Sequence, residues 1–285
     1  MSERYEKYVF NLDEDARKYC VETLHETEES RSAALTTLKQ WAEDNPRFHV
    51  KVDDRSLLAF LRGCKFDLDR TKAKLIDHYT MRRDVPEWYA KRDPALSEIQ
   101  DLVKLGIFVP LRRDHDRQLV VIIRVAAHDP KVHDQNNVFK AGNMILDAAV
   151  KDNEEAQIFG IIAIFDMTGV TFGHARQLTP GIIKKAVRSW QNYHCRPKRL
   201  EFINAPVYVN VILSIFKSFM SEKLKSRIQV HYNRLEGLHS VLPKEILPRD
   251  YGGEAEPLDD LISYWQQRLS ECSDWFAEDE KFKAE

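Results

Sequence analysis

A short, almost wholly apolar run constrains the fold of this chain more than any other stretch. From Val207 to Met220, only two serines, an asparagine and a lysine interrupt the apolar side chains. A helix that is apolar all round is normally buried in a core or lies in a membrane. Spanning a bilayer takes about 20 consecutive apolar residues, and this run is shorter and contains a lysine. The run therefore predicts a helix that does not span, with Pro206 in the first turn, where its missing N–H costs nothing.

Charge around this run separates two interpretations of the predicted helix. One is a central core helix followed by a solvated turn. The other is a movable lid, with one face over an apolar cavity and the other against lipid. Residues 176–234 hold twelve Lys and Arg against two acidic residues, a net charge of +10, whereas the whole chain has a formal net charge of −2. A strong local basic field in a nearly neutral chain implies an anionic partner surface, which favours the lid.

Basic side chains flank the apolar run on both sides. Arg196, Lys198 and Arg199 precede it, and Lys223 and Arg227 follow it. Because Lys223 and Arg227 are four residues apart, they would share one face of a helix. We expect these cations to meet lipid phosphates when the lid lies against a membrane.

Length and composition describe an ordinary globular protein. The chain has 285 residues, of which 43% are hydrophobic and 31% charged, enough for one large domain or two modest ones. Its four cysteines are scattered and form no CxxC pair, so neither a zinc site nor a redox motif is indicated, and a reducing compartment is favoured. The first 20 residues are charged and lack the apolar core of a secretory signal. We therefore expect any membrane contact to be peripheral and reversible.

Apolar periodicity divides the chain into a helical part, an α/β part and an acidic tail. Residues 1–90 show helical spacings, and Pro86 and Pro94 mark a boundary. Apolar strands at 119–125, 160–166, 200–203 and 228–230 then alternate with helices at 138–150 and 180–193, which predicts a mostly parallel sheet covered by helices. Residues 250–285 hold eleven acidic and three basic residues, with one apolar helical face that we expect to pack on the body.

The sequence lacks the signatures of common enzyme classes. Asp166 stands in a DxxG at the end of a strand, but a nucleotide hydrolase also needs a GxxxxGK[ST] loop, which is missing. We expect Asp166 to shape the turn instead. The GxSxG of serine hydrolases and the GxGxxG of dinucleotide-binding domains are also missing, and His128 and His133 have a poor spacing for a metal. The chain is thus expected to bind and carry, not to catalyse, without metal or cofactor.

Four long stretches resemble the CRAL-TRIO family of intracellular lipid-transfer proteins, especially its tocopherol-carrier, retinaldehyde-binding and clavesin branches. In chain order they read DDRSLLAFLRGCKFDLDR, IIAIFDMTGVTFGHARQLTP, RLEFINAPVYVNVILSIFKSFMSEKLKSRI and LPRDYGG. The resemblance implies an N-terminal helical domain and an α/β lipid-binding domain with a mostly parallel sheet, an apolar cavity and a mobile gate helix. The predicted domains are residues 1–90 and 91–254, followed by an acidic C-terminal helix at 255–285.

The resemblance also assigns residues to sites. The gate falls on residues 204–219, with Val207, Val211, Ile212, Ile215, Phe216 and Phe219 as its apolar side chains. The positions that hold a phosphoinositide head group in the tocopherol-carrier branch fall on Arg196, Lys198, Lys223 and Arg227. The cavity lining falls on Phe139, Ile145, Leu146, Ile161, Ala163, Phe165, Val187, Leu200 and Phe202, positions that equally suit a plain core. Where the tocopherol carrier has serines in its pocket, this chain has Gly142 and Leu146, which argues against tocopherol as the cargo.

The predicted function is that of an intracellular carrier. It would bind one small hydrophobic lipid, of tocopherol, retinoid or acyl-lipid kind, and exchange it at phosphoinositide-containing membranes. We expect a cytoplasmic monomer that visits endosomal or other internal membranes, binds no nucleic acid and needs no cofactor besides its lipid ligand. The alternative is a phosphoinositide-dependent adaptor in trafficking or signalling, which would hold no stoichiometric hydrophobic ligand and transfer no cargo.

Overall fold

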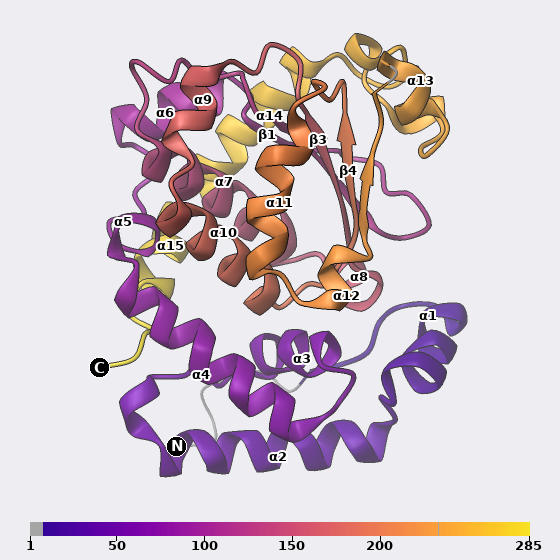
Figure 1. Cartoon of the computed structure of the whole chain (residues 1–285). Coiled ribbons are helices and arrows are strands. Elements are labelled where there is room, and N and C mark those ends of the chain that lie inside the picture. The colour runs from indigo at the N-terminus through magenta and orange to yellow at the C-terminus, as the bar shows by residue number, and fades with distance from the viewer. Residues whose placement is uncertain (1–7, 233) are drawn as a thin grey trace.

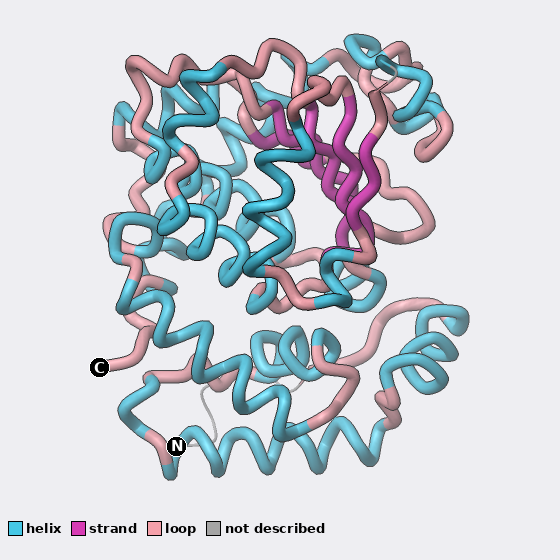
Figure 2. The backbone as a smooth tube through the Cα atoms, viewed as in Figure 1, coloured by secondary structure: helices cyan, strands magenta, loops and turns pink. Residues whose placement is uncertain are grey.

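A five-stranded sheet forms the centre of the upper part of the molecule (Figures 1 and 2). The computed structural model describes residues 8–232 and 234–285. The strands lie in sequence order: β1 (Phe108–Pro110), β2 (Leu119–Arg124), β3 (Ile161–Asp166), β4 (Pro197–Ile203) and β5 (Ile228–Val230). Strand β1 is antiparallel to β2, and the other neighbouring pairs are parallel. The predicted α/β class with a mostly parallel sheet is confirmed, and β1 is an edge strand that was not predicted.

The two faces of the sheet are covered by different helices. Successive side chains on a strand point to opposite faces, so Val120 and Ile122 face one way and Val121 and Ile123 the other. The first face packs against helices α6 (Ser97–Lys104), α7 (Gln135–Val150) and α14 (Leu258–Glu271). Helices α10 (Pro180–Asn192) and α11 (Val209–Phe219) lie over the second face, and Figure 1 shows α11 in front of the strands. Burial on both faces explains why the strands read as continuous apolar runs.

The helices of the first 90 residues form a layer of their own, which lies below the sheet in Figure 1. They are α1 (Glu14–Tyr19), the π-helical turn η1 (Cys20–Leu24), α2 (Glu28–Asp44), the 3₁₀ turn η2 (Pro46–Phe48), α3 (Asp54–Gly63) and α4 (Leu68–Asp84). The short helix α5 (Pro86–Tyr89) follows α4 and packs against the α/β part, where Trp88 contacts Phe139. The carboxylates of Asp53 and Asp67 cap α3 and α4 by accepting a backbone N–H three residues further on, at 2.9 and 3.0 Å. The predicted N-terminal helical part is confirmed.

The remaining elements are short and connect the larger ones. They are α8 (Glu154–Phe159), α9 (Phe172–Gln177), α12 (Glu222–Lys225), α13 (Arg234–His239) and the 3₁₀ turns η3 (Lys244–Ile246) and η4 (Arg249–Tyr251). Within residues 8–232 and 234–285, every helix falls short of the length and hydropathy that a membrane crossing needs.

The acidic tail forms two helices rather than the predicted one. Helix α14 packs on the sheet, where Trp265 Nε1 donates a hydrogen bond to the Pro110 carbonyl at 2.7 Å. Helix α15 (Ser273–Asp279) follows after a turn at Cys272. The chain then returns to the helical layer, where the Ala284 N–H donates to the Tyr79 carbonyl at 3.0 Å. The tail therefore ties the α/β part to the helices that precede it in sequence.

Candidate functional site

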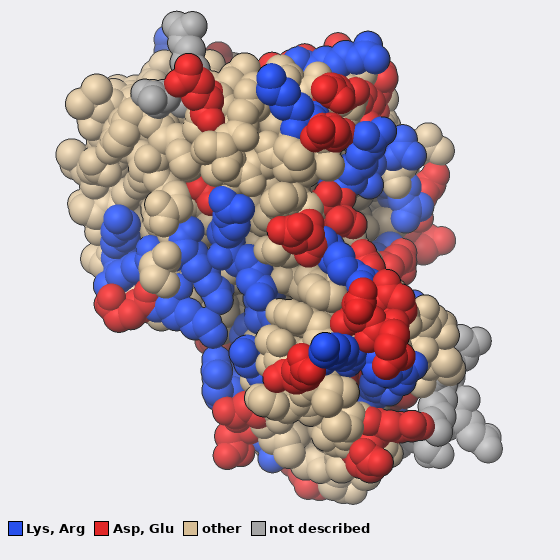
Figure 3. Space-filling model, turned by 90° about the vertical axis from the view of Figure 1, so that its right-hand side faces the viewer, with Lys and Arg blue, Asp and Glu red and all other residues tan. Residues whose placement is uncertain are grey.

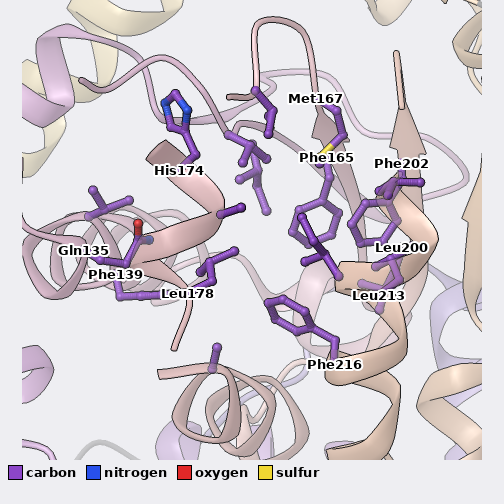
Figure 4. Close-up of a pocket in the computed structure, with 18 of the residues that line it drawn as sticks. Gln135, Phe139, Phe165, Met167, His174, Leu178, Leu200, Phe202, Leu213 and Phe216 are labelled. Atoms are coloured by element: carbon purple, nitrogen blue, oxygen red, sulfur yellow. The ribbon is translucent and has the colours of Figure 1, made fainter. Parts of the chain in front are cut away.

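An apolar cavity of about 150 Å³ lies between the sheet and helices α10 and α11 (Figure 4). Phe165 and Phe202 reach into it from neighbouring strands, with their rings stacked at a centroid distance of 4.5 Å. Leu213 and Phe216 of α11 face them from the other side. The cavity thus lies toward the carboxyl ends of the parallel strands, where open α/β sheets generally bind ligands.

The predicted cavity lining is only partly brought to the cavity. Phe139, Phe165, Val187, Leu200 and Phe202 line it. The other predicted positions, Ile145, Leu146, Ile161 and Ala163, are buried in the core without lining the cavity. Ile161 and Ala163 stand at the start and middle of β3, where Leu146 and Cys195 already pack against the sheet. The sequence could not tell these core positions from lining positions, because both are apolar and buried.

Several lining residues were not predicted. They include Phe108, Ile123, His128, Gln135, Met167, His174, Leu178, Trp190 and Met220. Phe108 also explains the departure at Gly142: a Cβ added there would lie 2.4 Å from the Phe108 ring. The space that a serine side chain would need is therefore filled by an aromatic ring.

Helix α11 is apolar on two opposite sides. On its inner side, Val209 and Leu213 are buried, and Ile212 and Phe216 line the cavity. On the outer side, Val211, Ile215 and Phe219 of α11 lie four residues apart, and Val207 precedes them in the turn before the helix. We call these four side chains the outer stripe; Val207, Val211, Ile215 and Phe219 are exposed by 91%, 67%, 40% and 37%. The predicted gate residues thus divide between the two sides.

Two polar side chains of α11, those of Ser214 and Ser218, form hydrogen bonds within the helix itself. The hydroxyls of Ser214 and Ser218 donate to carbonyls one turn back in the same helix, at 2.6 and 2.7 Å. The helix begins at Val209, not in a first turn at Pro206 as predicted, because residues 206–209 form a separate turn closed by the Val209 N–H on the Pro206 carbonyl at 2.9 Å.

Asp166 holds the loop that leads into α11. Its carboxylate accepts hydrogen bonds from the Thr168 N–H at 3.0 Å, Asn204 Nδ2 at 2.8 Å and the Tyr251 hydroxyl at 2.7 Å. Burial alone would raise the pKa of Asp166, but these hydrogen bonds outweigh it and lower that pKa. The predicted role of Asp166 in shaping the turn is confirmed, and it extends to the entry of α11.

A basic hollow of about 410 Å³ lies where the helical layer meets the α/β part. We call it the basic pocket. Its lining includes five cations and, among the described residues, no carboxylate; the cations are Arg70, Lys74, Arg196, Lys223 and Arg227. Figure 3 shows Lys and Arg side chains gathered in this region, below a broad surface that carries few charges. Cys64 also lines the pocket.

Arg196 is the most deeply buried cation of the basic pocket. It is 7% exposed, and its guanidinium donates to two backbone carbonyls, those of Arg62 at 2.8 Å and of Ile158. Its Nε has no hydrogen-bond partner among the described residues. A buried cation normally has an acidic partner, so a guanidinium held only by carbonyls leaves charge for an anion to neutralise.

The pKa values of the pocket cations agree with this deficit of negative charge. Burial is the largest cause that lowers the pKa of Lys223, and the charge of Arg227 lowers it further. Burial likewise lowers the pKa of Arg227, followed by the charge of Arg196. A bound dianionic phosphate would raise the pKa of both side chains, because its negative charge favours their protonated forms.

Two details of the predicted basic site are corrected by the structure. Helix α12 ends at Lys225, so Lys223 and Arg227 do not share a helix face; Arg227 lies in the following turn, where it donates to the Pro197 carbonyl. The side chain of Lys198 does not line the basic pocket: its Nζ donates to the Tyr19 hydroxyl at 3.2 Å. Arg70 and Lys74, from α4, were not predicted, because they lie more than a hundred residues away in sequence.

The described residues offer little for metal or thiol chemistry. Among them, no three His, Cys, Asp or Glu side chains come together as metal ligands. All four cysteines are buried and free. Burial is the main cause that raises the pKa of Cys20 to about 12, so this thiol stays protonated at neutral pH.

The fold and the site together define an α/β protein with an apolar cavity between its sheet and a covering helix. The chain belongs to the CRAL-TRIO family of lipid-binding transfer proteins: the sequence profile described as "CRAL/TRIO domain" matches residues 104–253. A second profile, described as "Pinta-like, UBA domain", matches residues 27–99 in the helical layer.

Individual relatives support this membership. The protein named alpha-tocopherol transfer protein-like from Homo sapiens is 31% identical over 275 residues, which cover 95% of this chain and 79% of that protein. Clavesin-2 from Rattus norvegicus is 27% identical over 225 residues, which cover 77% of this chain and 67% of that protein. The crystal structure of Sfh5 matches with a TM-score of 0.55 and 15% identity, over 91% of this chain and 98% of that one. At that identity the likeness concerns the fold alone.

Proposed function

We propose that this protein is a carrier that binds one hydrophobic lipid in the cavity and exchanges it at membranes that contain phosphoinositides. The observation that carries the proposal is the position of α11, which has the cavity on its inner side and the outer stripe on the other. The basic pocket adjoins the cavity, since Trp190 and Leu224 line both. One surface can therefore insert apolar side chains, bind a phosphate head group and release a ligand. We place this activity in the cytoplasm, with a monomer that acts without catalysis.

The cavity volume supports a gate that moves. Pockets for drug-sized ligands measure about 300–1,000 Å³, whereas this cavity measures about 150 Å³. A lipid of tocopherol or retinoid size therefore needs α11 and its inner side chains to move outward. Leu213 and Phe216 would lose protein contacts in that step, at about 1.5–3 kcal/mol of transfer free energy per side chain in water. Contact with lipid tails removes most of this cost.

Electrostatics would couple membrane binding to the same step. A Lys or Arg near an anionic bilayer contributes about 1 kcal/mol. Lys223 follows α11 after only three residues, so a phosphate bound in the basic pocket acts at the end of the gate. Opening is then a population shift, driven by binding that favours the open state.

Replacement of two pocket cations tests the electrostatic part. We expect Lys223→Ala combined with Arg227→Ala to weaken binding to phosphatidylcholine vesicles that contain a phosphoinositide by about 30-fold, since two cations contribute about 2 kcal/mol. Vesicle co-sedimentation measures this, and urea unfolding should show unchanged stability. Lys281→Ala combined with Lys283→Ala removes the same charge near the C-terminus and serves as the control. Equal affinity of the pocket variant and the control at low salt would contradict the proposal.

Extraction of the purified protein tests the carrier part. We expect organic solvent to release one hydrophobic molecule in nearly equimolar amount, identified by mass spectrometry. A protein that stays empty after incubation with mixed lipids, and still binds phosphoinositide vesicles, would instead be an adaptor in trafficking or signalling.

A further inference from the structure

The apolar cavity has one polar end. His128, Gln135 and His174 line it there, and Figure 4 shows Gln135 and His174 on the side away from Phe202 and Leu213. The rings of His128 and His174 meet at a right angle, 5.0 Å apart between centroids. All three residues are more than nine-tenths buried. Polar groups buried this deeply need hydrogen-bond partners. An atom without a partner in the protein therefore indicates which group, a donor or an acceptor, a bound ligand has to supply.

His174 is fully satisfied by the protein. Its Nδ1 accepts the Thr171 N–H at 3.1 Å, and its Nε2 lies 3.0 Å from the His128 carbonyl. Because a carbonyl can only accept, Nε2 carries the proton and the ring is in one neutral tautomer. His174 therefore has no ring nitrogen left for a ligand.

His128 has one ring nitrogen without a partner. Its Nε2 lies 3.2 Å from Gln177 Oε1, and the Gln177 amide nitrogen donates to the carbonyls of Pro130 and His133 at 3.1 and 2.7 Å. These two carbonyls fix the amide orientation, so Gln177 Oε1 accepts and His128 Nε2 donates. Nδ1 of His128 is then a bare acceptor, and it has no hydrogen-bond partner among the described residues. Burial is the largest cause that lowers the pKa of His128, which keeps the ring neutral at pH 7.

Two further polar side chains, those of Gln135 and Arg124, border the cavity. No hydrogen bond joins the Gln135 side chain to another described residue, so its amide is free to donate. Arg124 also borders the cavity, but its Nη1 donates to the Leu105 carbonyl at 2.9 Å. Ile123 and Val125 line the cavity, so strand alternation turns the Arg124 side chain to the opposite face.

We propose that the cargo carries a hydroxyl group, which donates its proton to Nδ1 of His128 and accepts a hydrogen bond from the Gln135 amide. This inference rests on the proposed carrier function. An ether, ester or aldehyde brings only acceptors, which leave the His128 acceptor unpaired. A carboxylate would place its lone pairs against the lone pair of His128 Nδ1. The Arg124 guanidinium, on the opposite face of the strand, would not neutralise its charge. A site built around a buried acceptor discriminates strongly against ligands that lack the matching donor.

Matched pairs of lipids test the inference without knowledge of the natural skeleton. The purified protein is offered octadecanol, phytol and cholesterol in competition with their methyl ethers and with stearate, and bound lipid is quantified after gel filtration. We expect an alcohol to exceed its own ether by about tenfold, the usual effect of one unpaired buried acceptor. Uptake without preference for any alcohol, or preference for stearate, would overturn the hydroxyl inference and leave the carrier intact. Uptake of none of the seven lipids would overturn the carrier and the inference together.

Variants of the two polar residues assign the effect to this site. His128→Phe should lose the preference by taking up alcohol and ether equally, whereas His128→Asn, which can again present an oxygen acceptor, should keep part of it. Gln135→Leu should reduce the preference without removing the His128 acceptor, and it carries the test if His128→Phe does not fold. A preference that survives in both His128→Phe and Gln135→Leu would overturn the assignment.

Discussion

Two buried arginines show how a residue's partners separate a structural charge from a binding charge. Arg62 is 1% exposed and donates from Nε and Nη2 to the two carboxylate oxygens of Glu26, at 2.7 and 2.8 Å. Arg196 donates to the Arg62 carbonyl but has no carboxylate partner among the described residues. The charge of Arg62 is neutralised within the fold, whereas the charge of Arg196 is available to bind an anion. The contact between them places the anion site on a rigid support.

Removal of Glu26 should therefore destabilise the fold. The side chain of Glu26 is fully buried and also accepts from Arg31 Nε at 2.9 Å. We expect Glu26→Ala to lower the free energy of unfolding by about 3 kcal/mol, because the buried Arg62 then keeps only the partly exposed Glu154, 2.9 Å from its Nη1, as an acidic partner. Urea unfolding measures the loss, with Glu22→Ala, an exposed position nearby, as the control. Equal stability of the two variants would show that water reaches and solvates Arg62.

A local pattern in the sequence pointed to residues that the structure brings together. Arg196, Lys223 and Arg227 were singled out because they flank an apolar run, and all three line the basic pocket. His128 was dismissed, because its meaning depends on Gln177, which lies 49 residues later. Residues that form a hydrogen-bond network only through tertiary contacts show no regular spacing in the sequence, so the sequence alone cannot predict the network.

At the scale of elements, α11 combines features of the two interpretations of the apolar run. Its inner side is buried, as the core-helix interpretation predicts, and its outer stripe is exposed apolar surface, as the lid interpretation predicts. Hydropathy could predict the helix but not this division, because both sides are apolar. Strand β1, with three residues and a proline, was likewise too short to show a pattern.

The outer stripe should contribute to membrane binding through apolar contact. We expect Val207→Ser combined with Val211→Ser to lower partitioning into phosphatidylcholine vesicles by about 30-fold, at roughly 1 kcal/mol per side chain. The loss should persist in high salt, whereas the effect of the Lys223 and Arg227 variant should shrink there, because salt screens charge.

Leu213→Ala, on the inner side of α11, should instead lower the free energy of unfolding by about 2–5 kcal/mol. Unchanged partitioning of the double serine variant would remove the outer stripe from the membrane contact.

At the scale of the whole molecule, the C-terminal tail joins the two parts whose junction forms the basic pocket. Asp279 of α15 accepts from Nη1 of Arg82, in α4, and from Nη1 of Arg92, each at 2.8 Å. The Asp279 carbonyl accepts from Arg82 Nη2 at 2.6 Å. An acidic tail packing on the body was predicted, but its partners were not, since they lie almost 200 residues earlier. The tail therefore holds the C-terminal end of α4, the helix that carries Arg70, against the α/β part.

The junction should consequently weaken in acid. Burial would raise the pKa of Asp279, but the charges of Arg82 and Arg92 outweigh it and lower that pKa from 3.8 to about 2. A carboxylate whose pKa is depressed in the folded state stabilises the fold above its unfolded pKa, and this contribution is lost as the pH falls from about 4 to about 2. We expect Asp279→Asn to be less stable than the wild type by roughly 2 kcal/mol at pH 7, and the difference to shrink across that acid range. Urea unfolding of both proteins at a series of pH values measures this difference. A stability difference that stays constant from pH 7 to pH 2 would mean that the charge of Asp279 does not hold the junction.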